Sequence, residues 1–181
     1  TGIFSKAPLY ETPASAIDIL IPYNFWRYLY FCEGVTPKQI KEWQETFRAT
    51  GKMVFDKAIF EAYRKGFLAH SSTDEETLDL IKAVYEADNY LLDPHAAVAL
   101  QAADVLKDKI GGEKMICLAT AHPSKFSKVI LKALQETTLP LMATHPSIEA
   151  AKRKCEKVYL CHYEHLEEAL MEVMEQNWDL K

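Results

Sequence analysis

The stretch from Asp93 to Phe126 constrains the fold most strongly, because it contains two helix starts separated by one apolar run. Asp93 before Pro94 is typical of an N-cap followed by the first helical residue. The carboxylate accepts hydrogen bonds from unpaired backbone N–H groups, and proline has no N–H to leave unpaired. The pair Gly111 and Gly112 permits a left-handed residue just beyond the end of that helix. We therefore predict a helix that begins at Pro94 and ends at this pair.

The apolar run at residues 115–119 predicts a strand that is covered on both faces, as in a parallel sheet. Pro123 then begins a second helix, whose apolar positions from Phe126 onward follow the helical period. The segment Thr120 to His122 therefore lies between the carboxyl end of a strand and the amino end of a helix. Open α/β sheets place their ligands at this position, so the sequence predicts a binding site there.

The remainder of the chain is expected to consist mainly of helices joined by short connections. Asn24 is the expected N-cap of an aromatic helix over residues 25–31. Two capping-box sequences, at residues 36–39 and 73–76, begin further helices. Helices outnumber strands and the strands lie between helices, which indicates an α/β fold class and one domain over residues 1–181. The other expected elements are an irregular lead-in at 1–10, short strands at 17–21, 139–143 and 157–161, and helices at 54–64, 146–155 and 166–174.

Charge and cysteine content argue against several classes of function. The 21 basic and 26 acidic residues give a net charge of −5, which provides no basic field for a phosphate backbone, so we expect no nucleic-acid partner. The apolar runs are too short to span a membrane and Thr1 begins no signal-peptide pattern, so we expect a cytoplasmic protein without a membrane partner. The four cysteines are few for this length and are expected to be reduced thiols in the core.

Three blocks of the sequence resemble those of a known family. Residues 91–98, Leu-Leu-Asp-Pro-His-Ala-Ala-Val, resemble the Leu/Cys-Asp-Pro-His-Thr-Ala-Val signature of threonine synthase. Residues 120–126, Thr-Ala-His-Pro-Ser-Lys-Phe, resemble its Thr-Ala-His-Pro-Ala-Lys-Phe signature. A third block, residues 16–19 followed by 24–27, resembles Ser-Met-Asp-Ile followed by Asn-Phe-Glu-Arg. The resemblance covers residues 1–134 and concerns only the C-terminal part of that enzyme.

The resemblance implies a fold and a cofactor. Threonine synthase belongs to the tryptophan-synthase-like (fold type II) pyridoxal phosphate enzymes, so this chain is expected to form a helix-rich portion of their three-layer fold. In the family, the residue that matches Thr120 hydrogen-bonds the pyridine nitrogen of the cofactor. A neutral hydroxyl does not hold that nitrogen protonated, and it therefore moderates the ring as an electron sink. On composition alone, Thr120 is about as well suited to capping the helix that follows it.

The resemblance also points to residues that would hold the phosphate of the substrate, O-phosphohomoserine. Asn24 and Arg27 are three residues apart and face one side of their helix. Arginine makes bidentate contacts with phosphate, and Asn adds a donor. Trp26 stands where the family usually has Glu, which leaves substrate geometry and specificity open. The alternative for Arg27 is a cation–π contact with Trp26 or Tyr30 that anchors the aromatic helix.

Other polar residues are weaker candidates. Lys125 lies near a helix start, where a cation is disfavoured unless it meets an anion, so it is either a phosphate contact or a solvated lysine. His95 and His122 are expected to be neutral and bonded to nearby backbone. No metal site is expected, because the Cys and His residues near the C-terminus fit neither the Cys-x2-Cys nor the His-x3-His spacing of zinc sites. These residues are Cys155, Cys161, His162 and His165.

Two parts of the family's active site have no counterpart in the sequence, namely the Schiff-base lysine and the Gly-rich loop that holds the cofactor phosphate. Both lie upstream in the family, and the chain begins at Thr1 rather than Met, so we expect it to be part of a longer polypeptide; loss of the initiator Met would give the same end. The whole enzyme would convert O-phospho-L-homoserine and water to L-threonine and phosphate. This chain alone is expected to be inactive and, with its apolar surface exposed, to self-associate.

Two other functions stay open on the sequence. One is a catalytically inactive interaction module that docks a partner through the aromatic helix at residues 25–31. The other is a homologue that acts on another phosphorylated amino acid, which the departure at Trp26 permits.

Overall fold

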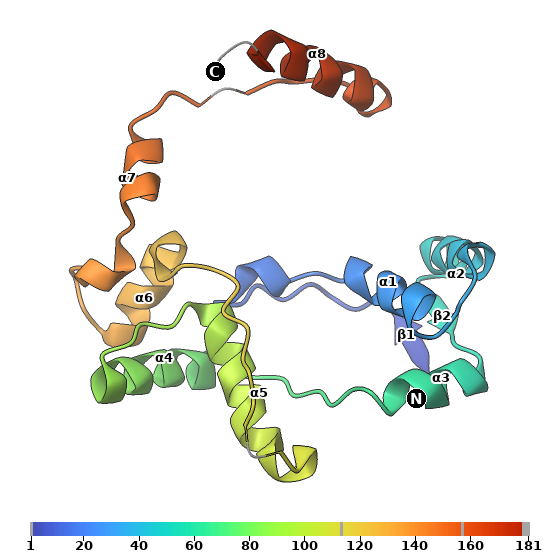
Figure 1. Cartoon of the computed structure of the whole chain (residues 1–181), viewed down its shortest axis with the longest axis horizontal. Coiled ribbons are helices and arrows are strands. Elements are labelled where there is room, and N and C mark those ends of the chain that lie inside the picture. Colours follow the sequence, from blue (N-terminus) through green and yellow to red (C-terminus); the bar gives the residue numbers. More distant parts are fainter. Residues whose placement is uncertain (1, 113, 157, 179–181) are drawn as a thin grey trace. The chain divides into compact units, whose positions relative to one another are not determined.

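The computed structural model describes residues 2–112, 114–156 and 158–178 (Figure 1). The described residues within Thr1–His145 form one compact unit, and those within Pro146–Lys181 form a second. The prediction of a single domain stays a prediction. The described structure is rich in helices, and its strands form one two-stranded sheet.

The first half of the larger unit is built around aromatic side chains. Strands β1 (Ile3–Ser5) and β2 (Lys52–Val54) pair antiparallel, with Ile3 opposite Val54. Helix α1 (Tyr23–Phe31) packs with α2 (Pro37–Thr50), and α3 (Lys57–Arg64) follows β2. We use the name aromatic cluster for the buried residues of these elements and their connections: Trp26, Leu29, Val35, Phe47, Met53 and Phe55.

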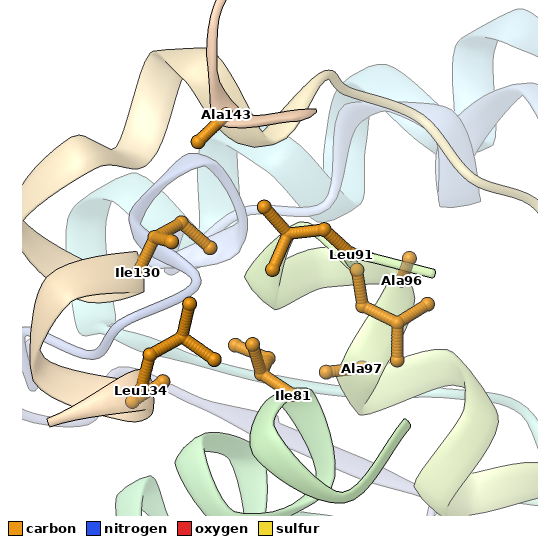
Figure 2. Close-up of a cluster of buried hydrophobic side chains, with 9 residues drawn as sticks. Ile81, Leu91, Ala96, Ala97, Ile130, Leu134 and Ala143 are labelled. Atoms are coloured by element: carbon orange, nitrogen blue, oxygen red, sulfur yellow. The ribbon is translucent and has the colours of Figure 1, made fainter. Parts of the chain in front are cut away.

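The second half of the larger unit has an aliphatic core. Helix α4 (Asp74–Asp88) packs against both α5 (Pro94–Ile110) and α6 (Ser127–Leu134). Short 3-10 turns precede and follow α6, at Pro123–Phe126 and Leu141–Ala143. We use the name aliphatic cluster for the buried residues drawn in Figure 2: Ile81, Leu91, Leu92, Ala96, Ala97, Ile130, Ala133, Leu134 and Ala143.

The start of α4 and both ends of α5 form as the sequence predicts. The Asp93 carboxylate accepts from the backbone N–H of His95 at 2.9 Å, and Pro94 is the first residue of α5. Gly111 ends α5 with φ of 64°, a conformation that strains residues with a Cβ. The capping box of α4 is complete, because Thr73 Oγ1 accepts from Glu76 N and the Glu76 carboxylate accepts from Thr73 N. Local capping chemistry therefore defines the ends of both helices.

The strand predicted at residues 115–119 does not form. This segment has no regular secondary structure and no ladder partner, and its side chains are exposed, with Ile116 at 89% and Leu118 at 73%. A covered strand needs neighbouring strands for its backbone groups, and the described residues provide none. The strand predicted at 157–161 is also wrong for residues 158–161, which are exposed and irregular, while Lys157 lies outside the described residues.

Several other local predictions are corrected. The lead-in contains β1. In place of the strand predicted at 17–21, the 3-10 turn Ser15–Ile17 ends at Ile17 and residues 18–21 are irregular, while 139–143 contains the 3-10 turn Leu141–Ala143. Helix α1 begins at Tyr23 with Pro22 at the N-cap, so Asn24 is inside the helix. The predicted helix 54–64 begins only at Lys57, because β2 extends to Val54.

Two side-chain predictions also fail in part. Thr36 caps α2 by accepting from Gln39 N, but the Gln39 amide donates to the Asp56 carboxylate at 2.8 Å in place of closing the capping box. The four cysteines are free thiols as expected, but they are exposed and not in the core. Two of them, Cys117 and Cys161, lie in the segments that were expected to be covered strands.

The smaller unit contains α7 (Pro146–Lys152), a 3-10 turn at Tyr163–His165, and α8 (Leu166–Trp178). The predicted last helix is confirmed, and the helix predicted at 146–155 is confirmed but ends at Lys152. Among the described residues, no helix has the length and apolar character that a membrane span requires.

Candidate functional site

The start of α5 is fixed by a buried Asp93–His95 pair. Asp93 Oδ1 accepts from both the backbone N–H and the ring Nδ1 of His95, each at 2.9 Å. The other ring nitrogen, Nε2, accepts from the backbone N–H of Ala16 at 3.1 Å. Because Nε2 accepts, the proton lies on Nδ1 and the imidazole is neutral. The expectation of a neutral histidine bonded to nearby backbone is therefore confirmed for His95.

His95 also connects the three sequence blocks that carry the family resemblance. It lies in the first block, bonds Ala16 of the third, and packs its ring against Phe126 of the second with centroids 4.9 Å apart. Next to Ala16, the Asp18 carboxylate accepts from the backbone N–H and the hydroxyl of Thr12, both at 2.7 Å. Residues far apart in the sequence are thus joined at His95 by one hydrogen bond and one ring contact.

The other part of the candidate site is the 3-10 turn at Pro123–Phe126, which His122 precedes. The His122 ring caps the 3-10 turn, because its Nδ1 accepts from Ser124 N at 3.2 Å and lies 2.7 Å from Ser124 Oγ. Since Nδ1 accepts the backbone N–H, the Ser124 hydroxyl donates to it and the ring proton lies on Nε2. The His145 ring packs edge-on against His122, with centroids 5.1 Å apart. His122 is bonded to nearby backbone, as expected. The helix predicted to begin at Pro123 begins instead with this 3-10 turn, and α6 starts only at Ser127.

A cavity of about 400 Å³ is lined by residues from the start of α5 and from the 3-10 turn that His122 caps. We call it the Asp93 cavity. One acidic side chain lines it, and that side chain, Asp93, is only 2% exposed. Its Oδ1 is fully used, whereas its Oδ2 is shielded from solvent and has no hydrogen-bond partner in the described structure. The lining residues are Tyr90, Leu91, Asp93, Ala96, Ala119, Ala121, His122, Pro123, Met142 and Thr144.

Thr120 lies between two residues of this lining, Ala119 and Ala121. Thr120 itself is not part of the lining. It is exposed, and its hydroxyl makes no hydrogen bond with the described residues. Thr120 therefore does not cap the following helix, a role that His122 takes.

The predicted phosphate-binding residues are exposed. Arg27 donates to Asn24 Oδ1 at 2.6 Å on the surface of α1, as their spacing predicts. Arg27 also lines a cavity of about 390 Å³ between α1 and α2. Within the described residues it makes no cation–π contact, so the anchoring role with Trp26 or Tyr30 is wrong. Lys125 is exposed and forms no ion pair in the part of the chain that the structure describes.

The structure does not bring all predicted site residues together. Asn24 and Arg27 lie on α1, beside the aromatic cluster, whereas Thr120 and Lys125 lie next to the aliphatic cluster. The sequence singled out Asp93 as a helix cap and gave no signal for the unpaired oxygen. No group of three or more His, Cys, Asp or Glu side chains among the described residues could hold a metal ion.

Comparisons with known proteins agree with the resemblance. A family model described as "Threonine synthase, C-terminal" matches residues 96–170. The threonine synthase of Schizosaccharomyces pombe is 35% identical over 136 residues, which cover 68% of this chain and 26% of that protein. The threonine synthase of Saccharomyces cerevisiae is 35% identical over 153 residues, which cover 72% of this chain and 30% of that protein.

Solved structures give the same result. A crystal structure of yeast threonine synthase superposes with a TM-score of 0.73 at 26% identity, covering 97% of this chain and 38% of that one. The PLP-bound threonine synthase from Brucella melitensis superposes with a TM-score of 0.64 at 29% identity, covering 78% of this chain and 30% of that one.

The two proteins and the two solved structures compared above are all threonine synthases. The two solved structures share the helix-rich arrangement described above. The chain belongs to the threonine synthase family and corresponds to its C-terminal part. It spans about a quarter to a third of the length of the curated relatives that it matches first, 26% and 30%.

Proposed function

We propose that this chain contributes the C-terminal portion of a pyridoxal phosphate-dependent threonine synthase, a carbon–oxygen lyase acting in threonine biosynthesis. The complete enzyme would convert O-phospho-L-homoserine and water to L-threonine and phosphate. The observation that carries the proposal is the exposed, unpaired hydroxyl of Thr120, in the segment that joins the apolar run to the His122 turn. Family membership supports the choice of reaction.

The residues present fit the cofactor at one contact. The Thr120 hydroxyl has no competing hydrogen bond in the described structure, so it is available to a ring nitrogen. The lysine and Gly-rich loop that the family uses have no match in this sequence. Pyridoxal phosphate, when bound, supplies an electron sink for carbanion chemistry. Thr120 would orient the ring and leave its nitrogen unprotonated, because a neutral hydroxyl offers no counter-charge to a pyridinium.

The buried Asp93–His95 pair would keep the contact between Thr120 and the cofactor in place. Asp93 and His95 fix the start of α5, and the contact between His95 and Phe126 ties the Thr120–Phe126 segment to it. Lys125 is an exposed cation within this segment, whereas Arg27, oriented by Asn24, lies on α1 beside the other cluster. We assign attraction of the substrate phosphate to one of these two places, Lys125 or the Asn24–Arg27 pair, with Thr120 alone at the cofactor.

The test is Thr120→Val in the complete enzyme, which keeps the shape of the side chain and removes the hydroxyl. We expect a shifted cofactor absorbance band and a reduced kcat. The matched control is Thr138→Val, because Thr138 is also exposed and has no hydrogen bond among the described residues. Spectra and turnover of Thr120→Val equal to those of the control would remove Thr120 from the cofactor site.

A second experiment tests whether the chain acts only within a longer polypeptide. We expect the chain alone to give no stable, stoichiometric absorbance band with pyridoxal phosphate and no phosphate release from O-phospho-L-homoserine. A saturable one-to-one band, abolished by replacing one lysine, would show that this chain carries its own cofactor anchor.

A homologue with another substrate is the second candidate, and Trp26 favours it. The indole is 6% exposed and packs in the aromatic cluster, so Arg27 has no carboxylate beside it at this position. The complete enzyme should therefore be assayed with both O-phosphohomoserine and O-phosphoserine. A higher kcat/KM with O-phosphoserine would favour this candidate over threonine synthesis.

A further inference from the structure

We propose that the Asp93 cavity is a binding site for a small molecule that carries a primary ammonium group. This inference depends on the geometry of Asp93 and not on the proposed reaction. Asp93 is 2% exposed, its Oδ1 accepts two N–H groups of His95, and its Oδ2 has no partner. The neutral His95 supplies hydrogen bonds to the carboxylate but no positive charge.

A buried carboxylate with an unpaired oxygen is costly, because it has lost water and gained no counter-charge. Within the described residues, no lysine or arginine pairs with Asp93. A cation that enters the cavity would supply both the missing hydrogen bond and the missing charge. The Asp93 carboxylate therefore favours a positively charged ligand in this cavity.

The number of free acceptors selects an ammonium group over other cations. A guanidinium pairs best with both oxygens of a carboxylate, and here Oδ1 is already occupied. A metal ion needs several ligands, and no suitable group of side chains exists among the described residues. An ammonium can donate to Oδ2 alone and to a second acceptor. Thr144 lines the cavity, and its hydroxyl donates to Leu141 O at 2.7 Å, which leaves its oxygen lone pairs as acceptors.

The cavity has room and a wall that can move. Its volume of about 400 Å³ accepts a molecule of the size of an amino acid. Oδ2 is shielded from solvent, so the wall must shift before a ligand can reach it. Part of the wall is made by Ala119 and Ala121, which lie on backbone outside any strand ladder or helix. Such backbone can be displaced without breaking regular hydrogen bonds.

The test is an NMR titration of the chain with three probes: propylammonium, which has charge and donors; tetramethylammonium, which has charge only; and propanol, which has neither charge nor ammonium donors. We expect saturable shifts of the His95, Ala121 and Thr144 amides with propylammonium. Binding of the other two should be at least about tenfold weaker, because a charge-assisted hydrogen bond is lost. Equal binding of the three probes, or no saturable shift with propylammonium, would overturn the proposal.

The matched variants are Asp93→Asn and Asp104→Asn. The first keeps an oxygen that can cap α5 and removes the charge, and we expect propylammonium to bind at least about tenfold more weakly to it. The second removes an exposed charge from the same helix and should leave binding unchanged. Unchanged binding to a folded Asp93→Asn chain would refute the role of the carboxylate. If that variant does not fold, the probe series on the original chain decides alone.

Discussion

Replacing Ile81 by Ala tests the aliphatic cluster on which the Thr120 segment depends. Ile81 is 0% exposed and lies in the cluster that α4, α5 and α6 share. The substitution removes about three methylene equivalents, which corresponds to about 2.4 kcal/mol of transfer free energy. The cavity left behind adds to this value, because packed helices collapse only partly. We therefore expect a loss of about 3–4 kcal/mol in the free energy of unfolding.

Ile116→Ala is the matched control, because it makes the same chemical change at a residue that is 89% exposed. It should change the free energy of unfolding by less than about 0.5 kcal/mol. The assay is urea unfolding of the chain followed by far-UV circular dichroism, with the slope of each transition compared between variants. A loss at Ile116 as large as that at Ile81 would show that the 115–119 segment is buried in solution and that the reasoning from exposure is wrong.

Three further predictions concern caps and pH. Thr73→Ala removes the capping box of α4 and should cost about 1 kcal/mol by urea unfolding, whereas Thr73→Ser should cost little. The hydrogen bond from the Thr73 backbone N–H lowers the pKa of the Glu76 carboxyl. The contribution of this hydrogen bond to stability is therefore complete above pH 4.5 and is lost as pH falls through the lowered pKa. The pKa is measured by NMR titration, and urea unfolding at several pH values, compared with Glu76→Gln, measures the contribution. The hydrogen bond to Glu33 raises the pKa of Tyr28 to about 12, so the contribution of this bond to stability is complete below pH 10 and is lost as pH rises through 12. In Glu33→Ala the tyrosinate absorbance of Tyr28 should appear at a lower pH than in the original chain.

Helix ends were predictable because their chemistry is local. The cap at Asp93, the capping box at Thr73 and the left-handed Gly111 each depend on residues within a few positions of one another. The same local rules were insufficient where a more distant group competes. The Gln39 side chain could have closed the box with Thr36, but Asp56, distant in sequence, accepts its amide. A capping sequence therefore predicts a helix start more reliably than it predicts the side-chain bonds there.

The sequence predicts a site at Thr120–His122 from an apolar run followed by a helix start, and this stays a prediction. Ala121 and His122 of that segment line the Asp93 cavity, but the other residues of the lining could not be predicted. The Asp93 cavity depends also on Met142 and Thr144, which reach it only after α6 and the following turn have folded. The unpaired Oδ2 of Asp93 likewise follows from tertiary burial, which no sequence period encodes. Both features arise only when the tertiary structure forms.

Two apolar segments that the sequence predicts to be strands are exposed in this chain. Residues 115–118 have the apolar character of a covered strand, yet they are exposed and line an open apolar cavity of about 660 Å³ beside α5. Residues 158–160 have the same character and are exposed too, with Leu160 at 95%. A strand is stabilised only by neighbours, and the relatives are several times longer than this chain, which covers 26% of one and 30% of another. If the chain works within such an enzyme, both segments should gain hydrogen-exchange protection there that they lack in the chain alone. Equal hydrogen exchange in the chain alone and in the longer enzyme would mean that neither segment forms a strand ladder there.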